Sequence, residues 1–173
     1  YVRDRFGSLI LEQTDFGLKA HLKENRENPC FLCSRLRRKR LFEIARDKGC
    51  GKIALGHNRD DLIETLFINM FYAGKIGTMK PRQSFFNGVL DIIRPLSYVD
   101  KKDIKGLSRA LEFPEFENAC PSAGHTKRRE ISDMLEGMYK RNRHIKGNIF
   151  RAMGNVARDY LLEKRDDRHS ESA

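Results

Sequence analysis

The stretch Lys52-Ile-Ala-Leu-Gly-His-Asn-Arg-Asp-Asp61 decides the fold of this chain. Its beginning, up to the glycine, is typical of a short buried strand. From about Arg59 to Ala73, apolar side chains recur at helical spacing. A strand, a glycine turn and a helix in this order form the βα unit of a parallel sheet. The chain is therefore expected to be an α/β protein.

Two elements are predicted on the N-terminal side of this unit. The apolar run at 8–12 predicts a short strand, and Leu36 and Leu41 share the apolar face of a helix predicted over residues 31–48. Gly49 is a suitable C-terminal stop for that helix. The chain thus enters the βα unit from a helix.

More elements are predicted on the C-terminal side. The pattern indicates a loop or loose hairpin, a strand, a helix with Asp100 as its N-cap, an edge strand and two amphipathic helices. A single compact domain is expected over residues 1–162, and the charged residues 163–173 are expected to form a disordered tail. The elements are predicted, in order, at 74–88, 89–93, 100–111, 113–116, 131–138 and 145–160.

The composition favours a polyanionic partner. The chain has 34 Lys and Arg residues against 24 Asp and Glu residues, a net charge of +10. Nucleic acid is favoured over a membrane, because no apolar run approaches the roughly 18 to 20 residues of a membrane span. No targeting peptide is visible, so a cytoplasmic location is expected. For any single basic cluster, a solvated helix face is an equally good explanation.

The four cysteines point to sulfur or metal chemistry. Cys30 and Cys33 form a Cys-x-x-Cys pair beside the basic run 34–40, and in a reducing cytoplasm such a pair is metal-binding or redox-active. Cys50 is expected to be a small buried residue, whereas Cys120 lies in a turn-rich loop and is a ligand or a bystander with equal weight. A zinc site usually has two ligand pairs, and three thiolates suit an iron-sulfur cluster with one open iron.

The segment from Gly56 to Asp61 lies where open α/β sheets bind ligands, at the carboxyl end of a strand and the start of a helix. His57 is placed to contact a nucleotide, and Asp60 and Asp61 are suited to hold Mg²⁺ on phosphates. A purely structural role has equal weight, because Asn58 can cap the helix and the aspartates complement its dipole.

Five segments, taken in order, resemble one known family. They are Pro29-Cys-x-x-Cys-Ser-Arg-Leu-Arg-Arg38, Lys52-Ile-Ala-Leu-Gly-His-x-x-Asp-Asp61, Thr65-Leu-Phe-x-Asn-Met-Phe-Tyr-x-Gly-Lys75, Ile93-Arg-Pro-Leu96 and the isolated Cys120. In this combination, the chain resembles the tRNA 2-thiocytidine synthetase family of PP-loop ATP pyrophosphatases from about residue 16 to residue 162.

The resemblance implies a Rossmann-like adenine nucleotide alpha-hydrolase fold and an ATP-dependent tRNA sulfurtransferase. ATP would adenylate the C2 oxygen of a cytidine in tRNA, and a sulfur species would then displace AMP. The implied cofactors are a [4Fe-4S] cluster, ATP and Mg²⁺. The implied partners are tRNA and a sulfur donor protein or sulfide, and the two C-terminal helices offer a surface for a homodimer.

The resemblance also assigns roles to individual residues. The predicted catalytic residues are His57, Asp60 and Asp61, and the predicted nucleotide-binding residues are Gly56, His57, Asp61 and Arg94. The predicted cluster ligands are Cys30, Cys33 and Cys120, and the predicted tRNA contacts are Arg35, Arg37, Arg38, Arg40 and Lys75.

One signature of the family is not in these 173 residues: the glycine-rich PP-loop, Ser-Gly-Gly-x-Asp-Ser. The family carries it on the first strand, so the first strands of the fold are expected to lie outside this sequence. Backbone amides of such a loop cradle phosphates. We therefore expect the 173 residues alone to bind ATP weakly in isothermal titration calorimetry, and micromolar affinity would contradict this.

Two other interpretations remain open at this point. The chain can be a non-catalytic RNA-binding module in which the basic clusters bind RNA and the Cys-x-x-Cys pair is a zinc site or a relic. It can also be a PP-loop thiolase with another tRNA specificity. Lysidine-forming relatives are disfavoured, because amine ligation needs no cysteine pair.

Overall fold

The computed structural model divides the chain into two compact units, each built from two separate stretches. Unit 1 comprises Tyr1–Asn58 and Lys80–Thr126, and unit 2 comprises Arg59–Met79 and Lys127–Ala173. The residues that the structure describes are 1–25, 29–115, 120–122, 124 and 126–162.

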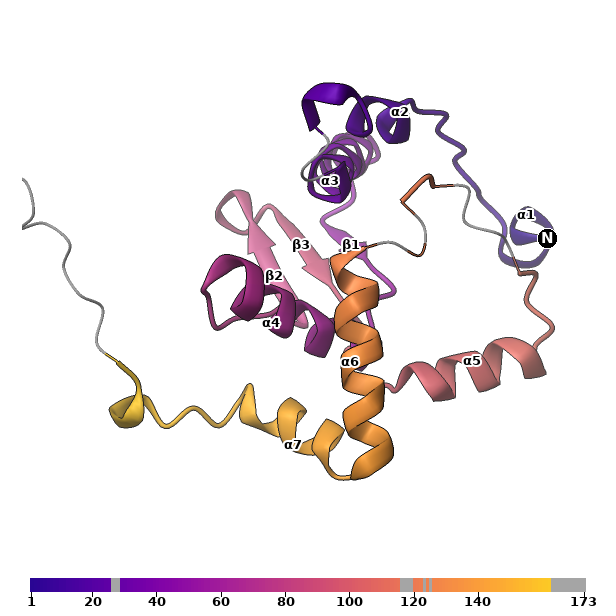
Figure 1. Cartoon of the computed structure of the whole chain (residues 1–173). Coiled ribbons are helices and arrows are strands. Elements are labelled where there is room, and N and C mark those ends of the chain that lie inside the picture. The colour runs from indigo at the N-terminus through magenta and orange to yellow at the C-terminus, as the bar shows by residue number, and fades with distance from the viewer. Residues whose placement is uncertain (26–28, 116–119, 123, 125, 163–173) are drawn as a thin grey trace, which may run out of the picture. The chain divides into compact units, whose positions relative to one another are not determined.

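Unit 1 contains a small mixed sheet (Figure 1). Its strands are β1 (Lys52–Ala54), β2 (Arg82–Phe85) and β3 (Leu90–Ile93), in the order β1-β3-β2. The central strand β3 runs parallel to β1 and antiparallel to β2. The pair β2–β3 is therefore a hairpin added to a parallel pair. Its first strand, β2, lies within residues 74–88, which were predicted to form a loop or loose hairpin.

An acidic side chain on β3 is held by its neighbours on β2. The Asp91 side chain is 8% exposed and forms an ion pair with Arg82 at 2.8 Å. Hydrogen bonds from Ser84 and Arg82 lower the pKa of Asp91, because both stabilise its ionised form. The apolar neighbours Leu90 and Ile92 are buried, so the sheet is held by apolar packing and by one satisfied carboxylate.

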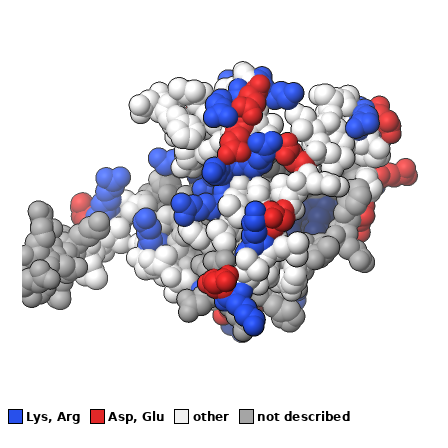
Figure 2. Space-filling model, turned by 90° about the horizontal axis from the view of Figure 1, so that it is seen from above, with Lys and Arg blue, Asp and Glu red and all other residues white. Residues whose placement is uncertain are grey.

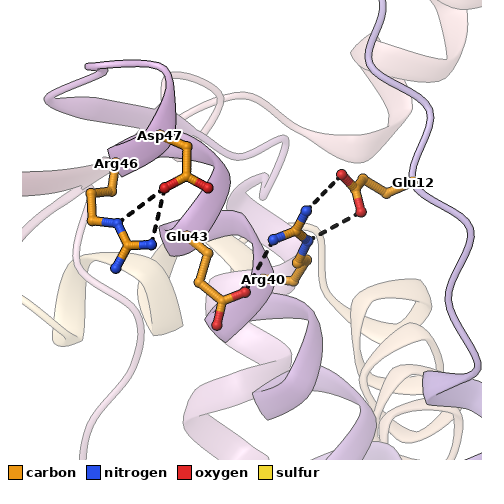
Figure 3. A network of polar contacts seen from close by, with 5 residues as sticks. All are labelled: Glu12, Arg40, Glu43, Arg46 and Asp47. Carbon is orange, nitrogen blue, oxygen red and sulfur yellow. Dashed lines mark hydrogen bonds and ion pairs between the residues drawn. The ribbon is translucent and has the colours of Figure 1, made fainter.

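The longest helix of unit 1 is α3 (Pro29–Asp47), which begins with a proline, a residue favoured in the first turn of a helix. The short helix α2 (Phe16–Ala20) packs against it. Arg40 on α3 joins Glu12 at 2.8 Å and Glu43 at 3.2 Å (Figure 3). The guanidinium of Arg40 lowers the pKa of Glu12, chiefly through its hydrogen bond. The segment before α2 is thereby fixed to the side of α3.

The remaining elements of unit 1 are short helices at its ends and between its strands. They are α1 (Val2–Phe6), η1 (Lys23–Asn25), η2 (Phe86–Gly88) and α5 (Lys101–Ala110).

Unit 2 is helical. It contains α4 (Arg59–Ala73), α6 (Lys127–Arg141), α7 (Ile145–Ala152) and the short η3 (Arg158–Tyr160). Its core is formed by Ile63 of α4 with Ile131 and Leu135 of α6, all at most 2% exposed. Side chains packed around this core include Phe67, Ile68, Tyr139, Ile149, Phe150 and Met153. The apolar faces of α6 and α7 are thus used within the unit.

Most predicted elements are confirmed within a few residues, and the helix at 59–73 is confirmed to the residue. Three predictions are wrong. Residues 8–12 form no strand, and Leu9, Ile10 and Leu11 are exposed, because the run has no strand to pair with in the described part of the chain.

The other two wrong predictions concern 113–116 and 145–160. Residues 113–115 form no strand, since the amide of Phe113 bonds to Ser108 in the turn that ends α5, while residue 116 lies outside the described residues. The last helix ends at Ala152, where a turn from Arg151 to Gly154 closes it. The predicted tail at 163–173 also lies outside the described residues.

Of the helices in the described part of the chain, not one combines the length and the hydropathy that a membrane span requires.

Candidate functional site

In unit 1, the carboxyl ends of β1 and β3 bring predicted nucleotide-binding residues to the same edge of the sheet. The strands pair in parallel with Ala54 opposite Ile93, and the ladder continues through a 2.9 Å hydrogen bond from the Leu55 amide to the Ile93 carbonyl. Gly56 and His57 follow β1, and Arg94 follows β3 directly. This edge is where open α/β sheets bind ligands.

Arg94 is the most unusual side chain at this edge, because it is a cation that is only 7% exposed. One of its Nη atoms donates to the carbonyl of Lys80, and its buried Nε has no hydrogen-bond partner among the described residues. Burial lowers the pKa of Arg94, and the positive charge of Arg38 lowers it further. A buried guanidinium near a second cation is stabilised by an anion.

Asp60 and Asp61 lie in the first turn of α4, in unit 2, and each forms an ion pair with a residue that is distant in the sequence. Asp60 pairs with Lys146 at 2.8 Å, and both side chains are about one fifth exposed, at 19% and 21%. Asp61 accepts a hydrogen bond from Arg128 at 3.0 Å. The aspartates therefore connect α4 to α7 and to α6.

Arg128 also reaches two further side chains of α4. It donates to Glu64 at 2.9 Å and to Thr65 at 3.3 Å. Glu64 is the most buried member of the group, since its side chain is 7% exposed. The sequence analysis missed Arg128, Lys146 and Glu64, and the only signal for Arg128 was its place in a basic cluster.

The first two predicted cluster ligands lie on the first turns of α3. Cys30 is exposed and Cys33 is half-buried, and both thiols are free. The spacing i, i+3, i+7, i+10 puts Cys30, Cys33, Arg37 and Arg40 on one stripe of the helix. This stripe, Cys30–Cys33–Arg37–Arg40, is called the cysteine stripe below.

The third predicted ligand, Cys120, is half-buried and forms no disulfide. Three thiols are a donor set that fits an iron-sulfur cluster. In the described part of the chain, no three His, Cys, Asp or Glu side chains are close enough together to hold a metal ion. The three thiols thus fit a cluster by their chemistry. Cys120 has to approach α3 for the three thiols to act together.

The expectation for the fourth cysteine is wrong, because Cys50 is exposed and not buried. It follows Gly49, whose positive φ of 65° ends α3 and turns the chain toward β1. The small side chain therefore lies on the outside of a turn.

The predicted tRNA contacts fall into two groups. Arg35, Arg37, Arg38 and Lys75 are exposed, and none of the three arginines forms an ion pair with a described acidic residue. Arg40 is half-buried and paired with two carboxylates, so a contact with tRNA competes with those pairs. Lys and Arg side chains are frequent on the face shown in Figure 2, with Asp and Glu interspersed.

An open depression of about 940 Å³ lies beside Arg40 and is lined otherwise by residues 12–16 and Leu18. Arg40 is its only predicted site residue, and the depression is separate from the sheet edge that holds His57 and Arg94.

Comparison with known proteins gives relatives that cover most of the chain. A tRNA-cytidine(32) 2-sulfurtransferase from Cupriavidus necator is 38% identical over 156 residues, which are 90% of this chain and 50% of that protein. Enzymes of the same name from Idiomarina loihiensis and Geobacter sulfurreducens are 41% and 36% identical, and the matches cover 89% and 94% of this chain. Over about nine tenths of its length, the chain is therefore similar to the tRNA-cytidine 2-sulfurtransferase family.

The chain spans about half the length of the first relatives: 50% of the Cupriavidus protein and 52% of the Idiomarina protein, against 65% of the Geobacter protein. No protein-family model matches it. The resemblance drawn from the cysteine and Gly-His motifs is thereby confirmed, and so is its preference over an unrelated RNA-binding module.

A solved structure shares the fold of this chain. A U34-tRNA thiolase from Methanococcus maripaludis, determined with its [4Fe-4S] cluster, aligns with a TM-score of 0.63 and 22% identity. The alignment covers 90% of this chain and 53% of the thiolase. The α/β class predicted from the sequence is confirmed, as part of a Rossmann-like domain.

Proposed function

We propose that the protein containing this chain is an ATP-dependent tRNA sulfurtransferase that converts a cytidine of tRNA to 2-thiocytidine. The observation that carries the proposal is the 38% identity, over 90% of the chain, to a tRNA-cytidine(32) 2-sulfurtransferase. The relatives' names specify cytidine 32, and we propose the same nucleotide.

Unit 1 contributes to the nucleotide site. Arg94 binds a phosphate of ATP with the guanidinium that lies buried after β3, and this proposal is supported by its unpaired Nε and by the second cation, Arg38. Gly56 lets the nucleotide approach the chain after β1, and His57 contacts the reacting group. The burial of Arg94 strengthens its contact with a phosphate.

Asp60 and Asp61 have two proposed roles, which follow from different observations. Their place in the first turn of α4 supports the coordination of Mg²⁺ on the phosphates. Their pairs with Lys146 and Arg128 support a structural role in unit 2. The two roles are compatible, because the two oxygens of a carboxylate together offer about four lone pairs.

Cys30, Cys33 and Cys120 are proposed to hold a [4Fe-4S] cluster. When it is bound, such a cluster supplies an iron with an open position that can carry sulfur to the activated cytidine. The three thiolates hold the cluster, and the donor is either a sulfur-carrying protein or sulfide.

The exposed arginines of α3 are proposed to bind the tRNA backbone. Replacing Arg35, Arg37 and Arg38 together with alanine removes three cations from one helix. We expect tRNA affinity to fall at least tenfold at moderate salt, with the slope of log K against log salt reduced by about two to three. Filter binding over a salt series measures both quantities.

A matched control removes the same charge elsewhere. Lys102, Lys105 and Arg109 are exposed on α5 and outside the predicted site. Their triple alanine variant is expected to change the salt slope less. Equal losses of tRNA affinity in the two triple variants would indicate non-specific attraction and would contradict a tRNA site on α3.

Arg94 gives a separate prediction for the complete protein. Arg94→Met removes the charge but keeps much of the volume, so we expect the KM for ATP to rise about ten- to a hundredfold, the range of one charge-assisted hydrogen bond. Steady-state kinetics of AMP release measures this. The control is Arg109→Met, which removes an exposed arginine on α5. An unchanged KM for Arg94→Met would reject the phosphate contact.

The proposed function is tested with the complete protein, purified without oxygen. It is incubated with tRNA and sulfide, with and without ATP, and the digested nucleosides are analysed by mass spectrometry. The expected result is 2-thiocytidine that appears only with ATP. Protein that carries iron and hydrolyses ATP but forms no 2-thiocytidine would contradict the proposed substrate.

Two general properties complete the proposal. The enzyme acts in the cytoplasm, where tRNA is available. A homodimer was expected from the amphipathic C-terminal helices, but their apolar faces pack on α4; the dimer therefore stays a prediction to be checked by analytical ultracentrifugation.

A further inference from the structure

A histidine and a serine far apart in the sequence are hydrogen-bonded close to the predicted cluster ligand Cys120. Nε2 of His21 lies 2.6 Å from Oγ of Ser122, and the two residues are 101 positions apart. His21 directly follows α2, and Ser122 stands two residues after Cys120. No motif in the sequence pointed to this pair.

The other ring nitrogen of His21 fixes the direction of the bond. Nδ1 lies 2.7 Å from the carbonyl of Gly17, which only accepts hydrogen bonds, so Nδ1 carries a proton. In the neutral imidazole, Nε2 is then the acceptor, and the hydroxyl of Ser122 donates to it. The ring is thus held by the backbone of α2 and oriented toward the loop that contains Cys120.

The path of the chain places this pair near the cysteine stripe. Glu12 binds Arg40, the last member of the stripe. The chain then enters α3 at Pro29. At a rise of 1.5 Å per residue, Pro29 lies about 16 Å from Arg40 along the helix axis. Residues 13–25 therefore run back along α3 from the level of Arg40 toward its first turn. His21 lies on this return path, after a helix that packs on α3.

We propose that His21 and Ser122 form a latch that tethers the segment from Cys120 to Ser122 beside α3, so that a small approach of Cys120 to Cys33 completes the three-thiol site. The proposal rests on the proposed cluster site and adds two positioning residues to it. Neither side chain has to touch the metal: the hydroxyl of Ser122 holds the backbone, and the backbone carries the thiol. The latch also explains how the thiols can be brought together from positions 87 residues apart in the chain.

The latch is tested first without iron. In a chain with Cys30→Ser and Cys50→Ser, Cys33 and Cys120 are the only thiols. A short bifunctional maleimide is expected to join them within one chain, as read from intact mass. Ser122→Ala and His21→Phe are expected to lower the cross-linked fraction at least fivefold, whereas Ser122→Thr, which keeps the hydroxyl, is expected to retain it.

Two controls separate positioning from general damage. Monofunctional maleimide is expected to label both thiols equally in all variants, and circular dichroism is expected to give the same melting midpoint. His21→Asn is a second variant if His21→Phe does not fold. The latch would be overturned if the chain with Cys30→Ser and Cys50→Ser alone is not cross-linked. It would also be overturned if adding Ser122→Ala to that chain leaves the cross-linked fraction unchanged.

A second measurement keeps the latch distinct from the proposed function. Chains with all four cysteines are reconstituted with iron and sulfide, and iron per chain is measured. The latch predicts less iron in Ser122→Ala than in Ser122→Thr. If no variant binds iron but the cross-linking pattern holds, the cluster proposal fails and the latch stands; if all variants bind iron equally, the latch is overturned and the cluster stands.

Discussion

Cys33→Ser is expected to abolish the iron-sulfur cluster. The replacement removes one of three thiolates, and serine is a poor ligand for iron in such clusters, so the remaining pair cannot hold the iron. After anaerobic reconstitution, we expect loss of the visible absorption and at least a tenfold fall in iron per chain. Thiolation activity of the complete protein is expected to disappear together with the absorption.

The fourth cysteine provides the matched control for this prediction. Cys50 is an exposed, free thiol like Cys30, but it lies in the turn after α3 and outside the proposed donor set. Cys50→Ser is expected to keep the absorption and the iron content. If Cys50→Ser and Cys33→Ser lose iron equally, the assignment of the three ligands is wrong; a colourless wild-type chain with one zinc per molecule would reject the cluster itself.

Arg128→Ala is expected to lower the free energy of unfolding more than a substitution of the neighbouring Arg129. The substitution removes one cation that lies within about 3 Å of two carboxylates, at 3.0 Å from Asp61 and 2.9 Å from the largely buried Glu64. Breaking such a pair is costly when one partner is buried, and because Arg128 is 44% exposed, we expect about 2 kcal/mol. This corresponds to a fall of about 5 °C in the melting midpoint.

The neighbouring residue on the same helix is the control. Arg129 pairs with Asp133 at spacing i, i+4, and both side chains are more than half exposed. Arg129→Ala is therefore expected to cost less than about 0.5 kcal/mol. Differential scanning fluorimetry compares the two variants, and equal midpoints would show that the buried carboxylate does not depend on Arg128.

The local pattern of the sequence predicted the local elements well. The helix at 59–73 followed from apolar side chains at helical spacing, and β1 and β3 followed from short apolar runs closed by glycine and proline. The run at 8–12 has the same local pattern and forms no strand, since a strand requires a neighbouring strand to bond with. That requirement is not visible in a window of a few residues.

The candidate site was predicted by residue type and not by geometry. The sequence placed Gly56 and His57 after β1 and Arg94 after β3, and parallel pairing then brings these positions to one edge. It did not predict that Asp61 would meet Arg128, 67 residues later, or that Asp60 would meet Lys146, 86 residues later. Such contacts depend on how helices pack, which no local spacing records.

The division of each unit into two stretches also has a consequence for synthesis on the ribosome. The core of unit 2 joins Ile63 to Ile131 and Leu135, so α4 leaves the ribosome long before its partners have been made. During that interval the whole sheet of unit 1 can form, because its strands end at Ile93. The apolar face of α4 meanwhile lacks its cover, which makes the nascent chain a substrate for chaperones until α6 emerges.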